Sequence, residues 1–198
     1  MYRRPDLTPA LRESTATIAT LVLLPLPAAA GPQVYRIDGA TTVPRVEYSN
    51  FGYPSQARFS RTRGTITLDR DARTGAVDVE IDAASGSTGH PLIDSFMGAE
   101  DVFDTAHFPL ITYKSPSIGF DGDTPARVDG TLTIKGITRP VRLEIAYFAC
   151  GLHAGFNREV CAATAVAKIR RSDFNAGKYA PLVSDEVTLV IPIAAVRQ

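Results

Sequence analysis

Short segments in which apolar and polar residues alternate recur along most of this chain. A period of two places all the apolar side chains of a segment on one face of a β-strand. Many one-sided strands must close into a barrel or pack as a sandwich to hide those faces, and a barrel of about eight strands is wide enough for one small ligand. The pattern therefore predicts an all-β fold. The alternating segments are residues 64–69, 76–82, 128–135, 141–147 and 186–193.

The first thirty residues differ from the rest and are typical of an export signal. Three arginines precede an apolar run that ends at Leu26, and three alanines that end at Ala30 follow it. The run is shorter than the roughly 20 apolar residues of a membrane span. An ordered helix is the alternative, which two prolines near the end of the run disfavour. We expect residues 1–30 to be a signal peptide, cleaved near Ala30, and residues 31–198 to form one domain.

Charge is balanced in this chain, with 21 basic and 21 acidic residues. Nucleic acids and anionic lipid surfaces select proteins with a basic excess, which is missing here. No second long apolar stretch follows the one near the N-terminus. We therefore expect neither a nucleic-acid partner nor stable insertion into a membrane. The sequence leaves the oligomeric state open, a homodimer included.

Cys150 and Cys161 are the two cysteines of the chain. In an exported protein a pair with this spacing indicates a disulfide, which here would join the end of one predicted strand to the start of the next. A metal site formed by Cys150, His153 and Cys161 is the alternative, but the spacing is not that of a zinc site. We predict the Cys150–Cys161 disulfide and no metal.

One segment, near residues 90–104, interrupts the strand pattern. Ser87 or Thr88 is placed to cap a short helix with a proline in its first turn. Phe96 and Phe103 in this segment would either cover a barrel mouth or cap the bottom of the core. The sequence does not decide between these two positions.

Catalytic motifs are not recognisable in the sequence. His90, His107 and His153 lie outside any nucleophile motif, and no glycine loop of the phosphate-binding kind is present. We therefore assign no catalytic residue. The alternative is an enzyme that acts on a lipid or a small oxidised compound, with turnover that depends on His107, Asp173 or Arg171.

Several short motifs follow one another in a fixed order along residues 34–193. They are residues 35–38, 103–109 with 113–115, 128–141, 171–174 and 184–187. This series resembles the YceI-like family. The resemblance implies an eight-stranded, antiparallel, lipocalin-like barrel that is exported to the periplasm and encloses a polyisoprenoid or a similar amphiphile.

The chain departs from that family at two places. Thr41 and Thr42 stand where many members carry a histidine soon after the first Ile-Asp, and residues 48–52 replace a common Val-x-His-x-Gly run. Contacts that those histidines make to a ligand head group are therefore not transferred to this chain. The apolar lumen that the resemblance implies does not depend on them.

Together these features predict a periplasmic protein that buries an isoprenoid lipid, either a polyisoprenoid or the tail of an isoprenoid quinone, with no obligatory cofactor. A stress-associated interaction module whose barrel is filled by its own side chains is a further alternative. Small residues such as Ala165 either leave room for the ligand or pack tightly against bulky neighbours. The residues predicted to contact the ligand are Phe59, Ile66, Leu68, Val79, Ile81, Tyr113, Leu132, Ile134, Leu143, Ile145 and Ala165, with Phe96 and Phe103 at a mouth.

Overall fold

The computed structural model describes residues 31–155 and 157–198, and the predicted signal peptide, residues 1–30, lies outside them. Strands dominate the described chain, as the alternating pattern predicts, with one α-helix and two short 3₁₀ helices. The strands are β1 (Gln33–Ile37), β2 (Arg45–Asn50), β3 (Tyr53–Phe59), β4 (Thr62–Asp69), β5 (Thr74–Asp82), β6 (Gly86–Ser87), β7 (Leu110–Asp121), β8 (Thr124–Ile134), β9 (Ile137–His153), β10 (Arg158–Arg170) and β11 (Glu186–Arg197).

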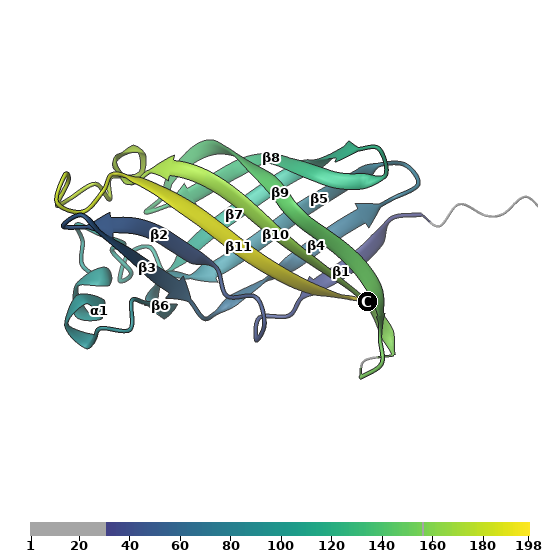
Figure 1. Cartoon of the computed structure of the whole chain (residues 1–198), viewed down its shortest axis with the longest axis horizontal. Helices are drawn as coiled ribbons and strands as arrows, with labels where there is room; N and C mark the ends of the chain where they lie inside the picture. The colour runs from purple at the N-terminus through teal and green to yellow at the C-terminus, as the bar shows by residue number, and fades with distance from the viewer. Residues whose placement is uncertain (1–30, 156) are drawn as a thin grey trace, which may run out of the picture.

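Eight of these strands form a closed antiparallel barrel (Figure 1). Around the barrel they follow the order β1, β4, β5, β7, β8, β9, β10 and β11. The last strand closes the ring by pairing with the first, with Tyr35 opposite Arg197. Closure leaves no free edge in the ring, which removes the tendency of open sheets to pair with other chains. The predicted eight-stranded barrel is confirmed.

The strands β2, β3 and β6 extend the barrel wall at one end. β11 pairs with β1 through Ala195 and with β2 through Val190, so the first two strands occupy successive stretches of the same edge. β3 then pairs with β2 and with the short β6. Because the width of a barrel grows with the number of strands around it, these additional strands widen the barrel at this end.

The step from β1 to β2 depends on Thr42, whose side chain is fully buried. Its hydroxyl accepts a hydrogen bond from the N–H of Ala194 (3.1 Å) and donates one to the carbonyl of the same residue (3.3 Å). The Thr42 side chain thereby supplies a hydrogen-bond donor and an acceptor to Ala194 of β11, at the step between the stretch paired with β1 and the stretch paired with β2. Gly39 lets the linking segment pass, because a Cβ there would lie 2.4 Å from the carbonyl oxygen of Thr62.

The helix α1 (Pro91–Met97) lies at the wide end, within the segment predicted to be helical. Its cap differs from the prediction, because His90 rather than Ser87 or Thr88 precedes the first turn. The chain bends between Thr88 and α1, which takes both hydroxyls away from the start of the helix. They donate instead to the carboxylate of Asp94, at 2.6 Å and 2.7 Å.

The opposite end of the barrel, which we call the base, is closed by a partly buried polar network. Tyr35 is 2% exposed, and its hydroxyl donates a hydrogen bond to Glu159 Oε2 (2.7 Å). Arg70 Nη2 donates to the other carboxylate oxygen (2.7 Å), and Arg197 Nη1 lies 3.9 Å from Oε2. The network joins β1, β10 and β11 to the residue that follows β4.

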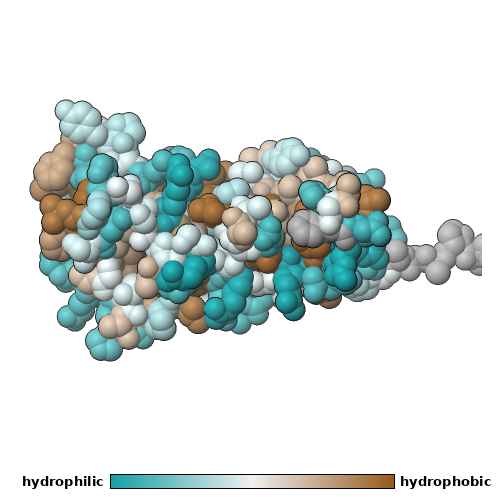
Figure 2. Space-filling model, turned by 90° about the horizontal axis from the view of Figure 1, so that it is seen from below, coloured by the Kyte–Doolittle hydropathy of each residue, from teal (hydrophilic) through white to brown (hydrophobic). Residues whose placement is uncertain are grey.

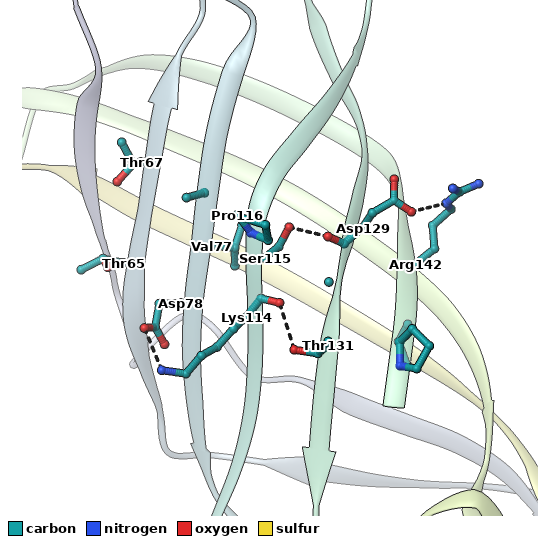
Figure 3. Close-up of a pocket in the computed structure, with 14 residues that line it drawn as sticks. Thr65, Thr67, Val77, Asp78, Lys114, Ser115, Pro116, Asp129, Thr131 and Arg142 are labelled. Carbon is teal, nitrogen blue, oxygen red and sulfur yellow. Dashed lines mark hydrogen bonds and ion pairs between the residues drawn. The ribbon is translucent and has the colours of Figure 1, made fainter. Parts of the chain in front are cut away.

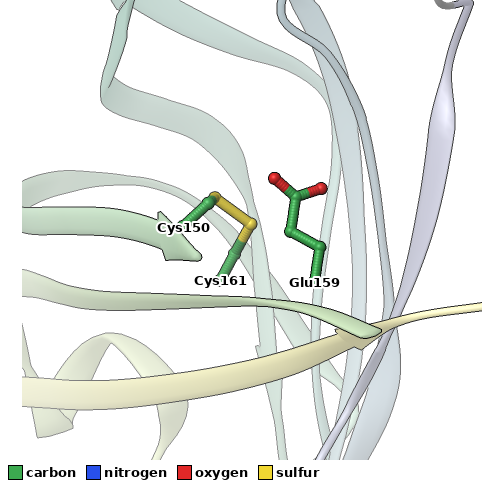
Figure 4. Close-up of side chains that lie close together, drawn as sticks. All are labelled: Cys150, Glu159 and Cys161. Carbon is green, nitrogen blue, oxygen red and sulfur yellow. A yellow bond between two sulfur atoms is a disulfide. The ribbon is translucent and has the colours of Figure 1, made fainter. Parts of the chain in front are cut away.

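The predicted disulfide lies beside this network (Figure 4). Cys150 of β9 and Cys161 of β10 face each other in register and are bonded, with Cα atoms 4.0 Å apart. A carboxylate oxygen of Glu159 lies within 4.8 Å of the sulfur atoms. Because both sulfurs belong to the disulfide, the alternative metal set with His153 lacks its thiolate ligands.

The carboxyl group of Glu159 is held in its charged form. Burial alone would raise its pKa, but the hydrogen bond from Tyr35 and the guanidinium groups of Arg70 and Arg197 outweigh burial and keep the pKa below its usual range. Burial, reinforced by the contact with Glu159, raises the pKa of Tyr35 to about 12. The base is therefore an ionised network at neutral pH.

The Glu159→Gln variant is expected to lower the free energy of unfolding by about 1–3 kcal/mol near neutral pH, because it replaces a charged hydrogen-bond acceptor. A carboxyl with a depressed native pKa stabilises the fold above its unfolded pKa, and this contribution is lost as pH falls through the native value. Urea unfolding of parent and variant should therefore give free energies that begin to converge as pH falls below the unfolded pKa of a glutamate and that meet once pH is below the lower native pKa. A difference that does not change with pH would contradict this account.

Candidate functional site

A cavity of about 680 Å³ lies inside the wide part of the barrel. All eight barrel strands contribute inner-facing residues to its wall, and β2, β3, α1 and the segment that precedes β11 complete it. Its volume is within the range of about 300–1,000 Å³ that is usual for small-molecule sites. Most of its wall is apolar, and no Asp, Glu, Lys or His side chain of the described residues borders it.

The cavity opens at the end of the barrel that carries α1. Five apolar residues border the cavity and are also exposed to solvent, and we call them the mouth. The mouth residues are Phe51, Ile93, Phe96, Tyr179 and Leu182. Phe103 lies behind them and packs edge-on against Phe59, with ring centroids 5.6 Å apart. The helical segment therefore lies at a mouth and does not cap the bottom of the core.

Nine of the residues predicted to contact a ligand border this cavity. They come from strands that lie far apart in the sequence and from the helical segment, which the barrel brings around one space. Contact with a ligand stays a prediction for each of them. The nine residues are Phe59, Val79, Ile81, Phe96, Phe103, Tyr113, Leu132, Ile134 and Leu143.

Four other predicted contacts do not border the cavity. They lie nearer the base, where side chains fill the barrel: Ile66, for example, is opposite the buried Tyr35. Ala165 is buried in the core between strands that place Ile145 and Ile191 beside it. Its small side chain therefore serves tight packing and is not part of the wall. The four residues are Ile66, Leu68, Ile145 and Ala165.

Two parts of the cavity wall are not among the residues that the sequence predicts to contact a ligand. The inner face of β11 contributes Val187, Leu189, Ile191 and Ile193, which alternate in the sequence and carry the same signal as the residues that were selected. The segment of residues 176–183 has no periodic pattern. Its contribution depends on how the chain folds back over the mouth, so no local signal indicated it.

Tyr113 is part of the wall and also joins two strands. Its hydroxyl lies 2.9 Å from the carbonyl oxygens of both Val128 and Val141, so one O–H is shared between them. Gly130 makes room for this ring, because a Cβ there would lie 2.6 Å from the Tyr113 hydroxyl. The deep part of the cavity thus has a polar atom whose hydrogen-bonding capacity is used by the barrel itself.

Arg171, at the start of η2 (Arg171–Phe174), holds the segment that forms one side of the mouth. Its guanidinium donates to the carbonyl oxygens of Ser184 (2.8 Å), Ala176 (2.7 Å) and Val183 (2.9 Å), with a longer bond to Lys178 (3.3 Å). The side chain is partly buried and borders the cavity. It fixes the backbone that carries the mouth residues Tyr179 and Leu182.

Polar groups gather on one side of the opening. Tyr48, Thr88 and Arg171 border the cavity there, and Asp94 lies behind Thr88. Burial raises the pKa of the Tyr48 phenol, the charge of Asp94 adds to this, and Arg171 opposes it. The phenol is therefore neutral near pH 7 and offers a hydrogen-bonding group at the edge of an otherwise apolar space.

The residues considered for catalysis are not brought together. Of His107, Asp173 and Arg171, only Arg171 borders the cavity. His107 is exposed, and its Nδ1 lies 2.8 Å from Asp104, whose carboxylate raises the pKa of the imidazole. Among the residues that the structure describes, the cavity wall brings together no carboxylate and histidine that could act as a paired acid and base.

A second hollow, of about 910 Å³, lies on the outer surface of the barrel over β4, β5, β7, β8 and β9 (Figure 3). It forms where Gly130 and the bulge at Ser115 and Pro116 leave little side-chain volume. Charged groups in it pair with each other: Lys114 with Asp78 at 3.1 Å, and Arg142 with Asp129 at 2.6 Å. We regard the interior cavity as the candidate site because its wall is apolar and surrounds the space on all sides of the barrel.

Comparison with known proteins agrees with this architecture. Protein YceI of Escherichia coli O157:H7 is 31% identical over 174 residues, which cover 83% of this chain and 87% of the relative. The crystal structure of BcnA from Burkholderia cenocepacia has a TM-score of 0.67 at 25% identity and covers 80% of this chain and 98% of its own. A polyisoprenoid binding domain from Saccharophagus degradans, implicated in plant cell wall breakdown, has a TM-score of 0.62 at 16% identity, with 84% and 99% covered.

The fold and the site define a lipocalin-like β-barrel with an apolar cavity in its interior. A model of the YceI-like domain matches residues 35–195, which is nearly all of the described chain. This chain belongs to the YceI-like family.

The Arg171→Met variant tests how the mouth is held. It removes the guanidinium but keeps an apolar stem, so residues 176–184 lose their main anchor, and the free energy of unfolding should fall by about 2–3 kcal/mol. Amide hydrogen exchange in residues 177–184 should become faster in the variant than in the parent protein, and this increase should exceed any change in the barrel strands. Arg171→Lys keeps the charge without the planar fork and should restore only part of the protection. Unchanged exchange in this segment would contradict the assigned role.

Proposed function

We propose that this protein binds a long isoprenoid-type lipid, a polyisoprenoid or the tail of an isoprenoid quinone, inside the barrel for transport, storage or sequestration. The observation that carries the proposal is the apolar cavity that opens at the mouth and is lined by all eight barrel strands. Burial of apolar surface contributes roughly 25 cal/mol per Å². Ordering a flexible chain offsets part of this gain, yet no polar contact is needed for binding.

The proposed ligand class also draws on a structural relative. The Saccharophagus degradans domain is described as polyisoprenoid binding, and its similarity to this chain is one of fold. The ligand class is therefore transferred as part of the proposal. The proposed role is binding and not turnover, since the cavity wall offers hydrophobic contacts and few polar groups.

The proposed location is the periplasm, with residues 1–30 removed as a signal peptide. The disulfide between Cys150 and Cys161 supports this location, because disulfides persist in oxidising compartments and are rare in the cytosol. The arginines and the apolar run at the N-terminus also favour export, because they are typical of a signal peptide.

Organic extraction followed by mass spectrometry tests the ligand class directly. Protein purified from the periplasm of a bacterial host is expected to release an isoprenoid or a quinone in a stoichiometric amount. A protein that releases no lipid, and that also takes up neither added prenols nor quinones, would contradict the proposal.

A pair of variants on β11 tests where the lipid lies. Leu189 borders the cavity, whereas Thr188 points to the other face of the same strand. Leu189→Trp fills part of the cavity and should weaken binding of a fluorescent prenol about tenfold or more, while Thr188→Trp should leave it within about twofold. Circular dichroism controls for folding. Equal effects of the two substitutions would place the lipid elsewhere.

A further inference from the structure

Large apolar side chains are exposed unevenly on this protein. Leu92 of α1 and Tyr53 at the start of β3 are each 75% exposed, and together with the mouth residues they surround the opening of the cavity. Figure 2 shows hydrophobic residues on the surface at the end that carries α1. We call these seven residues the rim. Three further exposed apolar residues, Val34, Tyr147 and Leu152, lie outside it.

The rim consists of three chain segments that are fixed to each other. The N–H of Phe51, in the turn between β2 and β3, donates to the carbonyl of Leu182 (2.7 Å), and Ser184 N–H donates to Ser49 (2.9 Å). Lys178 pairs with Asp101, which joins the segment before β11 to the chain that follows α1. An exposed apolar surface of this kind is held in place by the fold and is not a loose loop.

The cations Lys178 and Arg171 next to the rim have partners within the fold, as does the carboxylate of Asp94. Lys178 is paired with Asp101, and Asp94 accepts hydrogen bonds from Ser87 and Thr88. The guanidinium of Arg171 is directed to main-chain carbonyls. The rim therefore presents apolar and aromatic groups without a cationic excess, a composition that suits the interface between water and lipid and does not require anionic head groups.

We propose that the rim docks on the surface of a lipid bilayer, with the mouth of the cavity against the membrane. This inference rests on the proposed lipid-binding function. An isoprenoid that left the cavity into water would expose its chain. The equilibrium constant for transfer into water falls about fourfold for each methylene group that is exposed. Contact between the rim and the bilayer removes that exposure, because the five mouth residues line the cavity and face outward at the same time.

The contact is peripheral. None of the helices in residues 31–155 and 157–198 is long and apolar enough to cross a bilayer. The rim is made by α1, by the start of β3 and by connecting segments, so only side chains enter the interfacial region.

Flotation with phosphatidylcholine vesicles tests this inference, with two leucines as a matched pair. Leu92 in the rim and Leu152 near the base are equally exposed, at 75%, and neither borders the cavity. Leu92→Asp should lower the vesicle-bound fraction about tenfold, while Leu152→Asp should change it less than twofold. All three proteins carry the same N-terminal residues, so any contribution from these cancels. Binding of the parent should persist in high salt, because it does not depend on anionic lipid.

Several outcomes would overturn the inference. They are a parent protein that does not float with the vesicles, equal losses in the two variants, or binding that disappears in high salt. If size-exclusion chromatography shows a dimer that Leu92→Asp converts to a monomer, the rim covers a second copy of the chain and not a membrane.

Prenol binding in detergent-free solution separates this inference from the proposed function. Leu92→Asp should bind the prenol as the parent does, since Leu92 lies outside the cavity wall. Vesicle binding without prenol uptake would contradict the proposed function and leave the docking surface standing. Prenol uptake without vesicle binding would contradict the docking inference and leave the proposed function standing.

Discussion

The pairing of β11 with two successive partners is the constraint on which the rest of this structure depends. β1 pairs with one stretch of this strand and β2 with another, and Thr42 bridges the step between them through the Ala194 peptide. Toward the base, β1 closes an eight-stranded ring. Toward the mouth, β2 and β3 add wall, and the interior becomes wide enough for a cavity. One interrupted strand at the start of the domain thus produces both a packed half and a hollow half.

The two ends of the barrel are stabilised by different interactions. At the base, the charged network around Glu159 and the neighbouring disulfide join strands from both ends of the domain. At the mouth, Arg171 holds a connecting segment through hydrogen bonds to main-chain carbonyls, and large apolar residues remain exposed. We therefore expect the free energy of local unfolding to be smaller at the mouth than at the base. The end with the weaker local interactions is the end at which the cavity opens.

The all-β class could be predicted from the sequence, because a period of two identifies the inner faces of β4, β5, β8, β9 and β11. The eight-stranded barrel followed from the family resemblance and not from the period alone. Val79, Ile81 and Leu132 were placed correctly on the cavity wall by the period of two. The same period says nothing about depth, so Ile66 and Ala165 were assigned to the cavity although the base half is filled by side chains. Residues 176–183 could not be predicted, because they have no periodic pattern of their own. Hydrogen bonds from Arg171 hold them at the mouth.

The polar network at the base determines which end of the barrel the cavity can reach. Within the described part of the chain, the cavity wall reaches the mouth but includes neither Tyr35 nor Glu159, so the network separates the cavity from the base. Under the proposed function, a linear lipid enters and leaves at the mouth, and the end that enters first leaves last. The barrel then serves as a container that is filled and emptied at one end, and not as a conduit between two ends.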